Sequence, residues 1–268
     1  MRTVSSRQNP LVRAFRDAQA DDEGRRLLLD GLHLVRAARG AGVILDSVAV
    51  THRQFESNSE EGRFARELDR DGIDVIAVSE AVMSALSPLK SPSGIVALGS
   101  RRVVDLDAIC AHPDALVIAA VDVQDPGNLG ALLRAAEAGG GTGILACGAS
   151  AHPFSWKALR GSMGSAFRLP TAIVRTPLQA LKRAHRVNLR CIASVPRTGQ
   201  PPDAINWKPR TIVFVGGEGS GLSDELISEC DEAVTVPMQA PVESLNVAVA
   251  GALLVYEARR QRHGLGDG

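Results

Sequence analysis

The sequence predicts an α/β protein whose C-terminal part contains a mostly parallel β-sheet. Segments typical of strands and of helices alternate along all 268 residues, which indicates a sheet covered by helices. From residue 115 onward the strand segments are continuous apolar runs, as expected for strands that are buried on both faces. With 45% apolar residues, the chain is able to bury a sizeable core as one large or two modest domains.

The first hundred residues predict a smaller α/β domain. Short apolar runs indicate strands at Leu27–Leu29, Val48–Thr51, Val75–Val78 and Ile95–Leu98. Apolar residues at helical spacing indicate helices at Leu32–Arg39, Ser59–Arg70 and Glu80–Leu86. The segment Gly99–Pro113 mixes charge with weak periodicity and is a candidate linker. We therefore place the two domains at residues 1–105 and 106–268.

The C-terminal domain is predicted to alternate buried strands with helices. The apolar runs predict strands at Leu116–Val121, Gly143–Cys147, Leu189–Val195, Thr211–Val215 and Ala233–Val236. The intervening segments predict helices at Leu129–Ala138, Pro177–His185, Ser223–Glu229 and Ser244–Arg262. Ser223 is expected to cap its helix, whose first turn carries the acids Asp224 and Glu225, the favourable charge there.

Composition excludes several classes of protein. The longest apolar runs, Ala115–Val121 and Val247–Tyr256, are too short to span a bilayer. Met1–Phe15 lacks the apolar core of a secretory signal. Four cysteines without a CxxC pair and six scattered histidines predict buried thiols in a reducing compartment and no dedicated metal site. We therefore expect a cytoplasmic protein without a metal cofactor.

The net charge is zero, but the charges are segregated along the chain. Residues 157–210 hold eleven Lys and Arg residues against one acid, Asp203, whereas residues 211–257 hold eight acids and no Lys or Arg. The first sixteen residues add four arginines and no acid, as in an arm that binds phosphates. Two interpretations stay open: a positive face for a polyanion, or basic and acidic stretches that pair in the fold.

The first of three segments that carry chemistry lies between a strand and a helix. It reads Asp122-Val-Gln-Asp-Pro-Gly-Asn-Leu-Gly-Ala-Leu-Leu-Arg134. Open parallel sheets bind ligands at such places. Asn128 is expected to cap the helix, and Arg134 on its second turn suits a phosphate. For this segment alone, an ordinary strand–turn–helix with a surface arginine stays the alternative.

The second segment is a glycine-rich loop that directly follows a strand. Residues 213–223 read Val-Phe-Val-Gly-Gly-Glu-Gly-Ser-Gly-Leu-Ser. The spacing differs from that of a P-loop because no lysine follows the last glycine, and the ribose-binding acid of a dinucleotide site is missing. Since Glu218 would repel a pyrophosphate, the loop suits a cationic or adenosine-like ligand better than a polyphosphate.

The third segment runs from Val234 to Asn246 and leads into an apolar helix. Pro237 and Pro241 are expected to stop the strand and fix a rigid loop. We expect Ser244 to cap the helix and Asn246 to lie in its first turn. Capping by Ser244 does not explain a polar Asn246 there. Small residues at positions 248, 250, 251 and 252 would let this helix pack closely on a neighbour.

Together these segments resemble the SpoU/TrmH family of RNA ribose 2'-O-methyltransferases. The pattern is Asn-x-Gly-x-x-x-Arg, then Gly-x-Glu-x-x-Gly-Leu-Ser, then Val-Pro-Met and Ser-Leu-Asn-Val-Ala, in the family's order and spacing. A fourth stretch, Phe154-Ser-x-Lys-Ala-Leu-Arg-Gly-Ser-Met-Gly164, is similar as well. Gly31-Leu-His-Leu-Val35 is similar to the family's substrate-binding domain, which is related to a ribosomal-protein fold.

The resemblance implies a homodimeric enzyme that binds S-adenosylmethionine in a deep trefoil knot. The small residues at 247–253 suit a helix at such a dimer interface. The implied cofactor-binding residues are Gly216, Gly217, Val236, Met238, Leu245 and Asn246. The implied catalytic residues are Arg134, Asn128, Glu218, Ser244 and Asn246, with no metal.

Methyl transfer to a ribose hydroxyl favours a positioning role for Arg134. A guanidinium deprotonates only above about pH 12, so it is a poor general base. We predict that Arg134 grips the adjacent RNA phosphate and orients the 2'-hydroxyl, with Ser244 and Asn246 completing the hydrogen bonds.

The expected partner is RNA, with ribosomal RNA favoured over transfer RNA because of the separate N-terminal domain. Arg7, Arg13, Arg160 and Arg168 are the candidate RNA-binding residues. The stretch Ala151-His-Pro-Phe154 departs from the family's pattern, which leaves the role of His152 open. For Phe154 and Trp156 we predict core packing rather than stacking on a base.

The sequence argues against two other classes of function. A dinucleotide-dependent oxidoreductase would need a Gly-x-Gly-x-x-Gly after an early strand, and the sequence has none. A catalytically inactive RNA-binding relative would not need to retain Arg134, Glu218, Ser244 and Asn246. Methylation of transfer RNA stays the alternative within the enzyme class.

Overall fold

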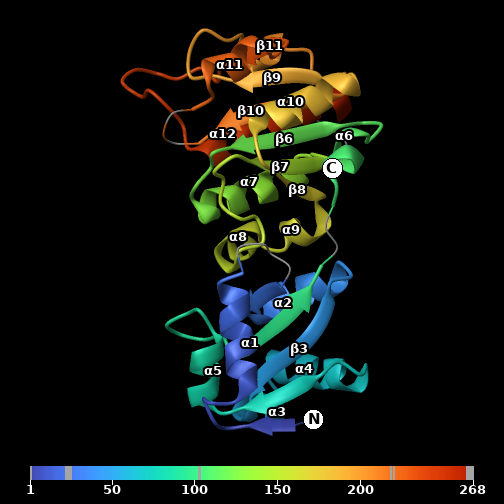
Figure 1. Ribbon diagram of the computed structural model, residues 1–268, viewed down its shortest axis with the longest axis vertical. Coiled ribbons are helices and arrows are strands. Elements are labelled where there is room, and N and C mark those ends of the chain that lie inside the picture. The colour runs from blue at the N-terminus through green and yellow to red at the C-terminus, as the bar shows by residue number, and fades with distance from the viewer. Residues whose placement is uncertain (1, 22–25, 102–103, 218, 220, 264–268) are drawn as a thin grey trace. The chain divides into compact units, whose positions relative to one another are not determined.

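The chain folds into two compact units, each with its own sheet (Figure 1). This computed structural model describes residues 2–21, 26–101, 104–217, 219 and 221–263. Unit 1 comprises Met1–Arg102 and Phe154–Phe167, and unit 2 comprises Val103–Pro153 and Arg168–Gly268.

Unit 1 contains a five-stranded mixed sheet in the order β1-β4-β3-β5-β2. Its strands are β1 (Arg2–Val4), β2 (Arg26–Asp30), β3 (Ile44–Thr51), β4 (Val75–Val78) and β5 (Ile95–Ser100). β1, β4 and β3 run parallel, and β5 pairs antiparallel with both β3 and β2. The helices are α1 (Pro10–Gln19), α2 (Leu32–Gly40), α3 (His52–Glu56), α4 (Glu60–Arg70), α5 (Glu80–Leu86) and α8 (Trp156–Ser162).

Residues 2–19 are an integral part of unit 1 and do not form a separate arm, while phosphate binding by their arginines stays a prediction. β1 pairs with β4, and α1 buries Leu11, Val12 and Phe15 in the core. Asn9 caps α1 by accepting a hydrogen bond from the Leu11 amide at 3.0 Å, and Pro10 occupies the first helical position. The arginines of this segment stay exposed on the outer face.

Unit 2 contains a six-stranded, fully parallel sheet in the order β11-β9-β10-β6-β7-β8. Its strands are β6 (Leu116–Val121), β7 (Gly143–Cys147), β8 (Thr171–Val174), β9 (Arg190–Ser194), β10 (Thr211–Gly216) and β11 (Glu232–Val234). The predicted parallel sheet and its five predicted strands are therefore confirmed, and β8 was missed.

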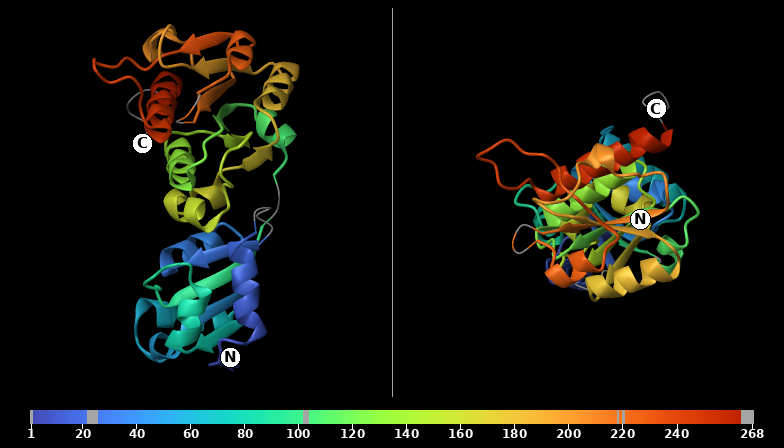
Figure 2. Two further views of the ribbon diagram at one scale, coloured as in Figure 1. Left: turned by 60° about the vertical axis from the view of Figure 1, so that its left-hand side comes forward. Right: turned by 90° about the horizontal axis from the view of Figure 1, so that it is seen from above.

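Helices cover both faces of this sheet (Figure 2). One face carries α7 (Pro126–Ala138) and α12 (Val247–His263), and the other carries α6 (Leu106–Cys110), α10 (Pro177–Arg186) and α11 (Asp224–Ser228). The short helices α9 (Ser165–Arg168) and η1 (Pro202–Ala204) lie in the connections. Double coverage explains why β6, β7 and β10 are almost completely buried apolar runs.

The candidate linker Gly99–Pro113 is more structured than expected. β5 extends to Ser100, and α6 contributes Ile109 and Cys110 to the core of unit 2. Among the described residues, no helix combines the length and the apolar character that crossing a membrane requires. Cys110, Cys147 and Cys191 are buried free thiols, as predicted, and Cys230 is half-buried. Burial raises the pKa of Cys147 to about 12, so this thiol is neutral at physiological pH.

Candidate functional site

The candidate site of unit 2 is a crevice at the carboxyl ends of β6 and β10. These two strands are neighbours in the sheet, and each continues into a loop at the same edge. A small cavity of about 150 Å³ opens between the loops, lined by Asp122, Val123, Gln124, Asp125, Asn128, Gly217, Gly219 and Gly221. The first and second sequence motifs therefore meet in space.

Gly216 and Gly217 allow the two loops to approach each other. A Cβ atom on Gly217 would lie 2.1 Å from the carbonyl oxygen of Asp122, and one on Gly216 would lie 2.6 Å from the carbonyl carbon of Gly221. The Gly217 amide instead donates a hydrogen bond of 2.7 Å to the Val121 carbonyl. Any side chain here would push the loops apart, so both positions require glycine.

The helix that borders the crevice is capped by Asp125 and not by Asn128, contrary to our expectation. α7 begins at Pro126, and the Asp125 side chain accepts a hydrogen bond from the Asn128 amide at 2.8 Å. Because Asp125 satisfies the helix end, the side chain of Asn128 is left for another contact.

That contact joins the first and third motifs. The amide nitrogen of the Asn246 side chain donates to Oδ1 of Asn128 at 2.9 Å. Oδ1 of Asn246 accepts from the backbone amide of Ala248 at 2.9 Å, so Asn246 caps α12. The prediction that Ser244 caps this helix is therefore wrong, because α12 begins at Val247 and Ser244 lies exposed in the preceding loop.

Arg134 lies on the exposed side of α7, two turns beyond the start of the helix. Its guanidinium makes no hydrogen bond or ion pair with any described residue, although Glu137 lies on the next turn. An exposed cation without a protein partner can bind an anion from solution, because no existing ion pair has to be broken first.

The remaining predicted cofactor residues do not line the crevice. Val236, Met238 and Leu245 are half-buried in the irregular segment between β11 and α12. Glu218, which we expected at the reaction centre, lies outside the described residues. The structure thus brings together Asn128, Asn246 and Gly217, and leaves the other cofactor positions outside the described cavity.

Asp122 is a crevice residue that the sequence analysis did not single out. It adopts a left-handed backbone conformation with φ of 54°, which is uncommon for a residue with a side chain. Its Oδ1 accepts a hydrogen bond of 2.7 Å from the Ala149 amide. This bond connects the loop after β7 to the crevice. Neither residue spacing nor composition predicts this hydrogen bond between Asp122 and Ala149.

The four predicted RNA-binding arginines differ in how they are held. Arg160 is exposed without a partner among the described residues, and Arg7 donates to the Ala81 carbonyl at 2.9 Å. Arg13 faces Asp17 at 3.8 Å. Both arms of Arg168 bind Glu137, at 2.6 and 2.7 Å, which raises the pKa of Arg168.

The two interpretations of the segregated charges both hold in part. Arg190 pairs with Glu232, and Arg197 lies 3.7 Å from Glu243, so the basic and acidic stretches do meet. Other exposed basic residues of the basic stretch have no ion pair with a described residue; they are Lys157, Arg160, Arg175, Lys182, Arg186 and Lys208.

Phe154 and Trp156 pack within unit 1, as we predicted. Phe154 is 4% exposed, and the Arg101 guanidinium carbon lies 3.2 Å from the centre of its ring. Trp156 packs against the core cluster that contains Phe15. The burial of Phe154 removes its ring from stacking on a base, whereas Trp156 is half-buried.

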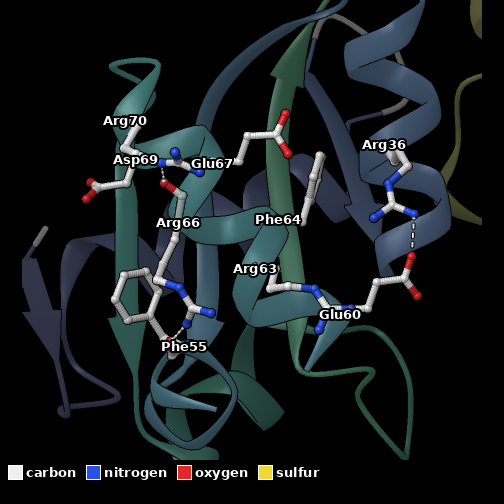
Figure 3. Close-up of a pocket in the computed structure, with 9 residues that line it drawn as sticks. All are labelled: Arg36, Phe55, Glu60, Arg63, Phe64, Arg66, Glu67, Asp69 and Arg70. Carbon is white, nitrogen blue, oxygen red and sulfur yellow. Dashed lines mark hydrogen bonds and ion pairs between the residues drawn. The ribbon is translucent and has the colours of Figure 1, made fainter. Parts of the chain in front are cut away.

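Unit 1 has a broader hollow of about 770 Å³ with mixed charge (Figure 3). Its lining residues are Arg36, Phe55, Glu60, Arg63, Phe64, Arg66, Glu67, Asp69 and Arg70. Arg36 donates to Glu60 at 2.6 Å, and Arg66 donates to the Ser57 carbonyl at 3.1 Å while stacking on Phe55. Because these guanidinium groups already hold neighbouring elements together, we assign no ligand to this hollow.

Comparison with known sequence families gives two matches that together cover most of the chain. The SpoU rRNA Methylase family matches residues 115–256, and the MRM3-like substrate binding domain matches residues 11–97. An uncharacterized tRNA/rRNA methyltransferase of Synechocystis is 34% identical over 97% of this chain and 94% of its own length. The 23S rRNA (guanosine(2553)-2'-O)-methyltransferase RlmP of Bacillus subtilis is 29% identical over 97% of this chain and all of its own length.

Solved structures agree over the same extent. The crystal structure of an RNA 2'-O ribose methyltransferase superposes with a TM-score of 0.81 and 31% identity, covering 97% of this chain and 98% of that one. An rRNA methyltransferase of Sinorhizobium meliloti, bound to S-adenosylmethionine, gives a TM-score of 0.84 and 28% identity, with 97% of each chain covered.

Proposed function

Because the chain belongs to the SpoU rRNA methylase family, we propose that it transfers a methyl group from S-adenosylmethionine to a ribose 2'-hydroxyl of ribosomal RNA. The observation that carries this proposal is the crevice of unit 2, where Asn128, Asn246 and Gly217 converge at the carboxyl edge of a parallel sheet. Residues 1–105 would hold the RNA and residues 106–268 the cofactor, a division supported by the two family matches, although Phe154–Phe167 pack with unit 1.

The residues of the crevice fit an adenosine-like cofactor. Gly217 lines the cavity, and Gly216 beside it keeps the two loops close together, since a Cβ at either position would collide with backbone. We assign Gly216, Gly217, Val236, Met238, Leu245 and Asn246 to cofactor binding, with the segment between β11 and α12 completing a site that the described cavity forms only in part. S-adenosylmethionine supplies an activated methyl group on its sulfonium.

Arg134 would orient the RNA for the reaction. Its exposed guanidinium, which has no partner among the described residues, would bind the phosphate next to the target ribose with two parallel hydrogen bonds. Fixing that phosphate places the neighbouring 2'-hydroxyl, and placement is the larger part of what such a reaction needs.

The bond between Asn128 and Asn246 would hold the polar edge of the site in place. It joins the start of α7 to the start of α12 across 118 residues of sequence. We assign Asn128, Asn246, Ser244 and Glu218 to the surroundings of the reacting hydroxyl, where Ser244 lies exposed and available as a hydrogen-bonding group. Arg7, Arg13 and Arg160 would contact RNA phosphates directly. Arg168 would contact a phosphate only after giving up its present partner, Glu137.

We further propose a cytoplasmic homodimer with the family's knotted topology. α12 presents Val249, Leu253 and Tyr256 at 48%, 46% and 51% exposure, on one face at helical spacing, which suits a second copy of the chain. Gly251 packs on Leu132 of the same chain, so the small residues serve α7 and leave this apolar face for the partner.

Labelled methyl transfer to unmodified ribosomal and transfer RNA pools tests the proposal. The full chain is expected to label ribosomal RNA at one linkage that resists alkali, as a 2'-O-methyl group does. Arg134→Ala should lower the rate by about 100-fold while cofactor binding persists. Arg134→Lys should also be impaired, since lysine cannot bind the phosphate with two arms. Labelling of transfer RNA alone would show that the substrate is transfer RNA and not ribosomal RNA. Near-normal turnover of Arg134→Lys would contradict the positioning role of Arg134.

A further inference from the structure

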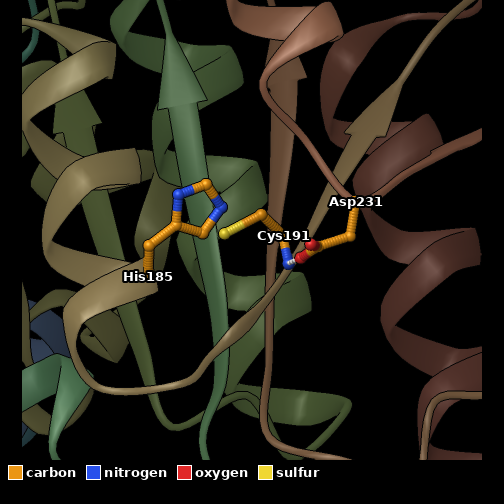
Figure 4. A group of neighbouring side chains, drawn as sticks. All are labelled: His185, Cys191 and Asp231. Atoms are coloured by element: carbon orange, nitrogen blue, oxygen red, sulfur yellow. Dashed lines mark hydrogen bonds between the residues drawn. The ribbon is translucent and has the colours of Figure 1, made fainter.

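Three side chains with metal-binding atoms meet at the edge of the unit 2 sheet that is opposite the crevice. They are His185 at the end of α10, Cys191 in β9 and Asp231 just before β11 (Figure 4). Their ligand atoms all lie within 4.8 Å of one another. Because all six strands are parallel, the amino ends of β9 and β11 lie at this edge, away from the methyl-transfer site.

Backbone hydrogen bonds hold Asp231 and Cys191 together. The Cys191 amide donates to Oδ2 of Asp231 at 2.7 Å, and the Asp231 amide donates to the Cys191 carbonyl at 2.8 Å. Figure 4 shows the His185 ring beside the Cys191 sulfur and the Asp231 carboxylate beside the Cys191 nitrogen. The His185 ring makes no hydrogen bond or ion pair with another described residue, so a ring nitrogen is available as a ligand.

The cluster is reached from solvent through a shallow hollow of about 440 Å³. Its lining includes two members of the cluster, His185 and Asp231, together with Asn188, Leu189 and Arg190, whereas Cys191 is buried and is not part of the lining. The cation that lines this hollow, Arg190, forms an ion pair with Glu232 and donates to the Asn206 carbonyl. An incoming cation would therefore meet one carboxylate, one imidazole and one thiol.

We propose that His185, Cys191 and Asp231 bind a zinc ion. Thiolate sulfur, imidazole nitrogen and carboxylate oxygen are the three ligand types that zinc takes in proteins, and a water molecule would complete a tetrahedral site. Binding breaks the S–H bond of Cys191, and its proton passes to solvent as the sulfur–zinc bond forms. The ion would tie the end of α10, the start of β9 and the turn before β11 into one unit. This inference does not rest on the methyl-transfer proposal.

Metal titration of the full chain tests the site directly. After treatment with a chelator, the protein is expected to take up about one zinc ion per chain in competition with a chromophoric chelator. Zinc should also raise the melting temperature, because it binds the folded chain preferentially. Cobalt(II) in place of zinc should give the charge-transfer absorption of a cobalt–thiolate bond.

Matched variants identify the ligands. Cys191→Ser and Asp231→Asn are expected to lose at least about 10-fold in zinc affinity, and Cys191→Ser should lose the cobalt–thiolate absorption. Cys230→Ser removes a neighbouring thiol that is outside the cluster and should change neither. Retained binding of S-adenosylmethionine would show that each variant is folded. Failure of the wild-type chain to bind zinc, or equal affinity in wild type and Cys191→Ser, would overturn the proposal.

Discussion

Units 1 and 2 each contain a glycine where two stretches of backbone touch, yet the two glycines serve different purposes. In unit 1, a Cβ on Gly62 of α4 would lie 2.1 Å from the Gln54 carbonyl oxygen of α3. In unit 2, a Cβ on Gly217 would lie equally close, 2.1 Å, to the Asp122 carbonyl oxygen. The first contact packs one helix on another, whereas the second brings together two loops that end parallel strands.

The difference lies in the sheets. Unit 1 has a mixed sheet in which β5 runs antiparallel to its neighbours, so its loops are divided between the two edges. Unit 2 is fully parallel, so the loops that follow β6 and β10 gather at one edge and form a crevice. The strand order and direction around a close backbone contact therefore decide whether its glycine only allows packing or also helps to form a binding site.

Gly217→Ala should have the largest effect on the site. Because the new methyl group would collide with backbone, we expect a loss of about 1–3 kcal/mol in stability and at least about 10-fold in S-adenosylmethionine affinity. Calorimetric titration and thermal unfolding measure the two effects. Gly219→Ala is the matched control for stability alone, because no described atom lies within 4 Å of its Cβ position although Gly219 also lines the cavity. Wild-type cofactor affinity in Gly217→Ala would contradict the role of Gly217 in forming the cofactor site.

Gly62→Ala should cost a similar amount of stability without touching the cofactor. The added methyl group would collide with the Gln54 and Ser57 carbonyl oxygens, so we expect a loss of about 1–3 kcal/mol from unit 1. At temperatures where the variant is folded, titration should give the wild-type S-adenosylmethionine affinity. Gly40→Ala, with open space at its Cβ position, is the control and should be tolerated. If Gly62→Ala lowered the cofactor affinity and Gly40→Ala did not, the Gly62 contact of unit 1 would also affect the cofactor site, and the comparison with Gly217 would fail.

The fold of unit 2 was readable from the sequence because its strands are continuous apolar runs. The predicted bounds of β6 and β7 agree with the structure to the residue. β8 was missed because it is short and exposes Ile173 at 52%, which interrupts the apolar run. The signal for α1 was present but overlooked: Asn9 and Pro10 precede apolar residues at helical spacing.

The candidate site was only partly readable. The motifs located the loops of the crevice, but they assigned the caps of α7 and α12 to Asn128 and Ser244 instead of Asp125 and Asn246. Capping depends on which residue stands directly before the first helical turn, and sequence predicts helix starts poorly. Contacts between distant segments have no sequence signal. The zinc cluster that we propose, against our expectation of no metal site, joins residues from three separate elements.

Asn246→Ala should have a smaller effect and sharpen the assignment of the cap. It removes the acceptor for the Ala248 amide and the bond to Asn128, so we expect a loss of about 1–2 kcal/mol. The urea midpoint of unfolding measures this change. Ser244→Ala, which alters an exposed loop residue, should stay within about 0.5 kcal/mol of wild type. Equal losses in the two variants would contradict Asn246 as the cap.

Arg168→Ala should have the smallest effect, because its charge is already used within the protein. Its ion pair with Glu137 is partly exposed, so losing it should cost only about 0.5 kcal/mol. RNA binding, measured as a function of salt concentration, should lose about one phosphate contact in Arg160→Ala and less in Arg168→Ala. Glu137→Gln releases Arg168 from its partner and should strengthen RNA binding. If Arg168→Ala and Arg160→Ala weaken RNA binding equally, the RNA must displace Glu137, and Arg168 of unit 2 would be less committed to the fold than the paired Arg36 and Arg39 of unit 1.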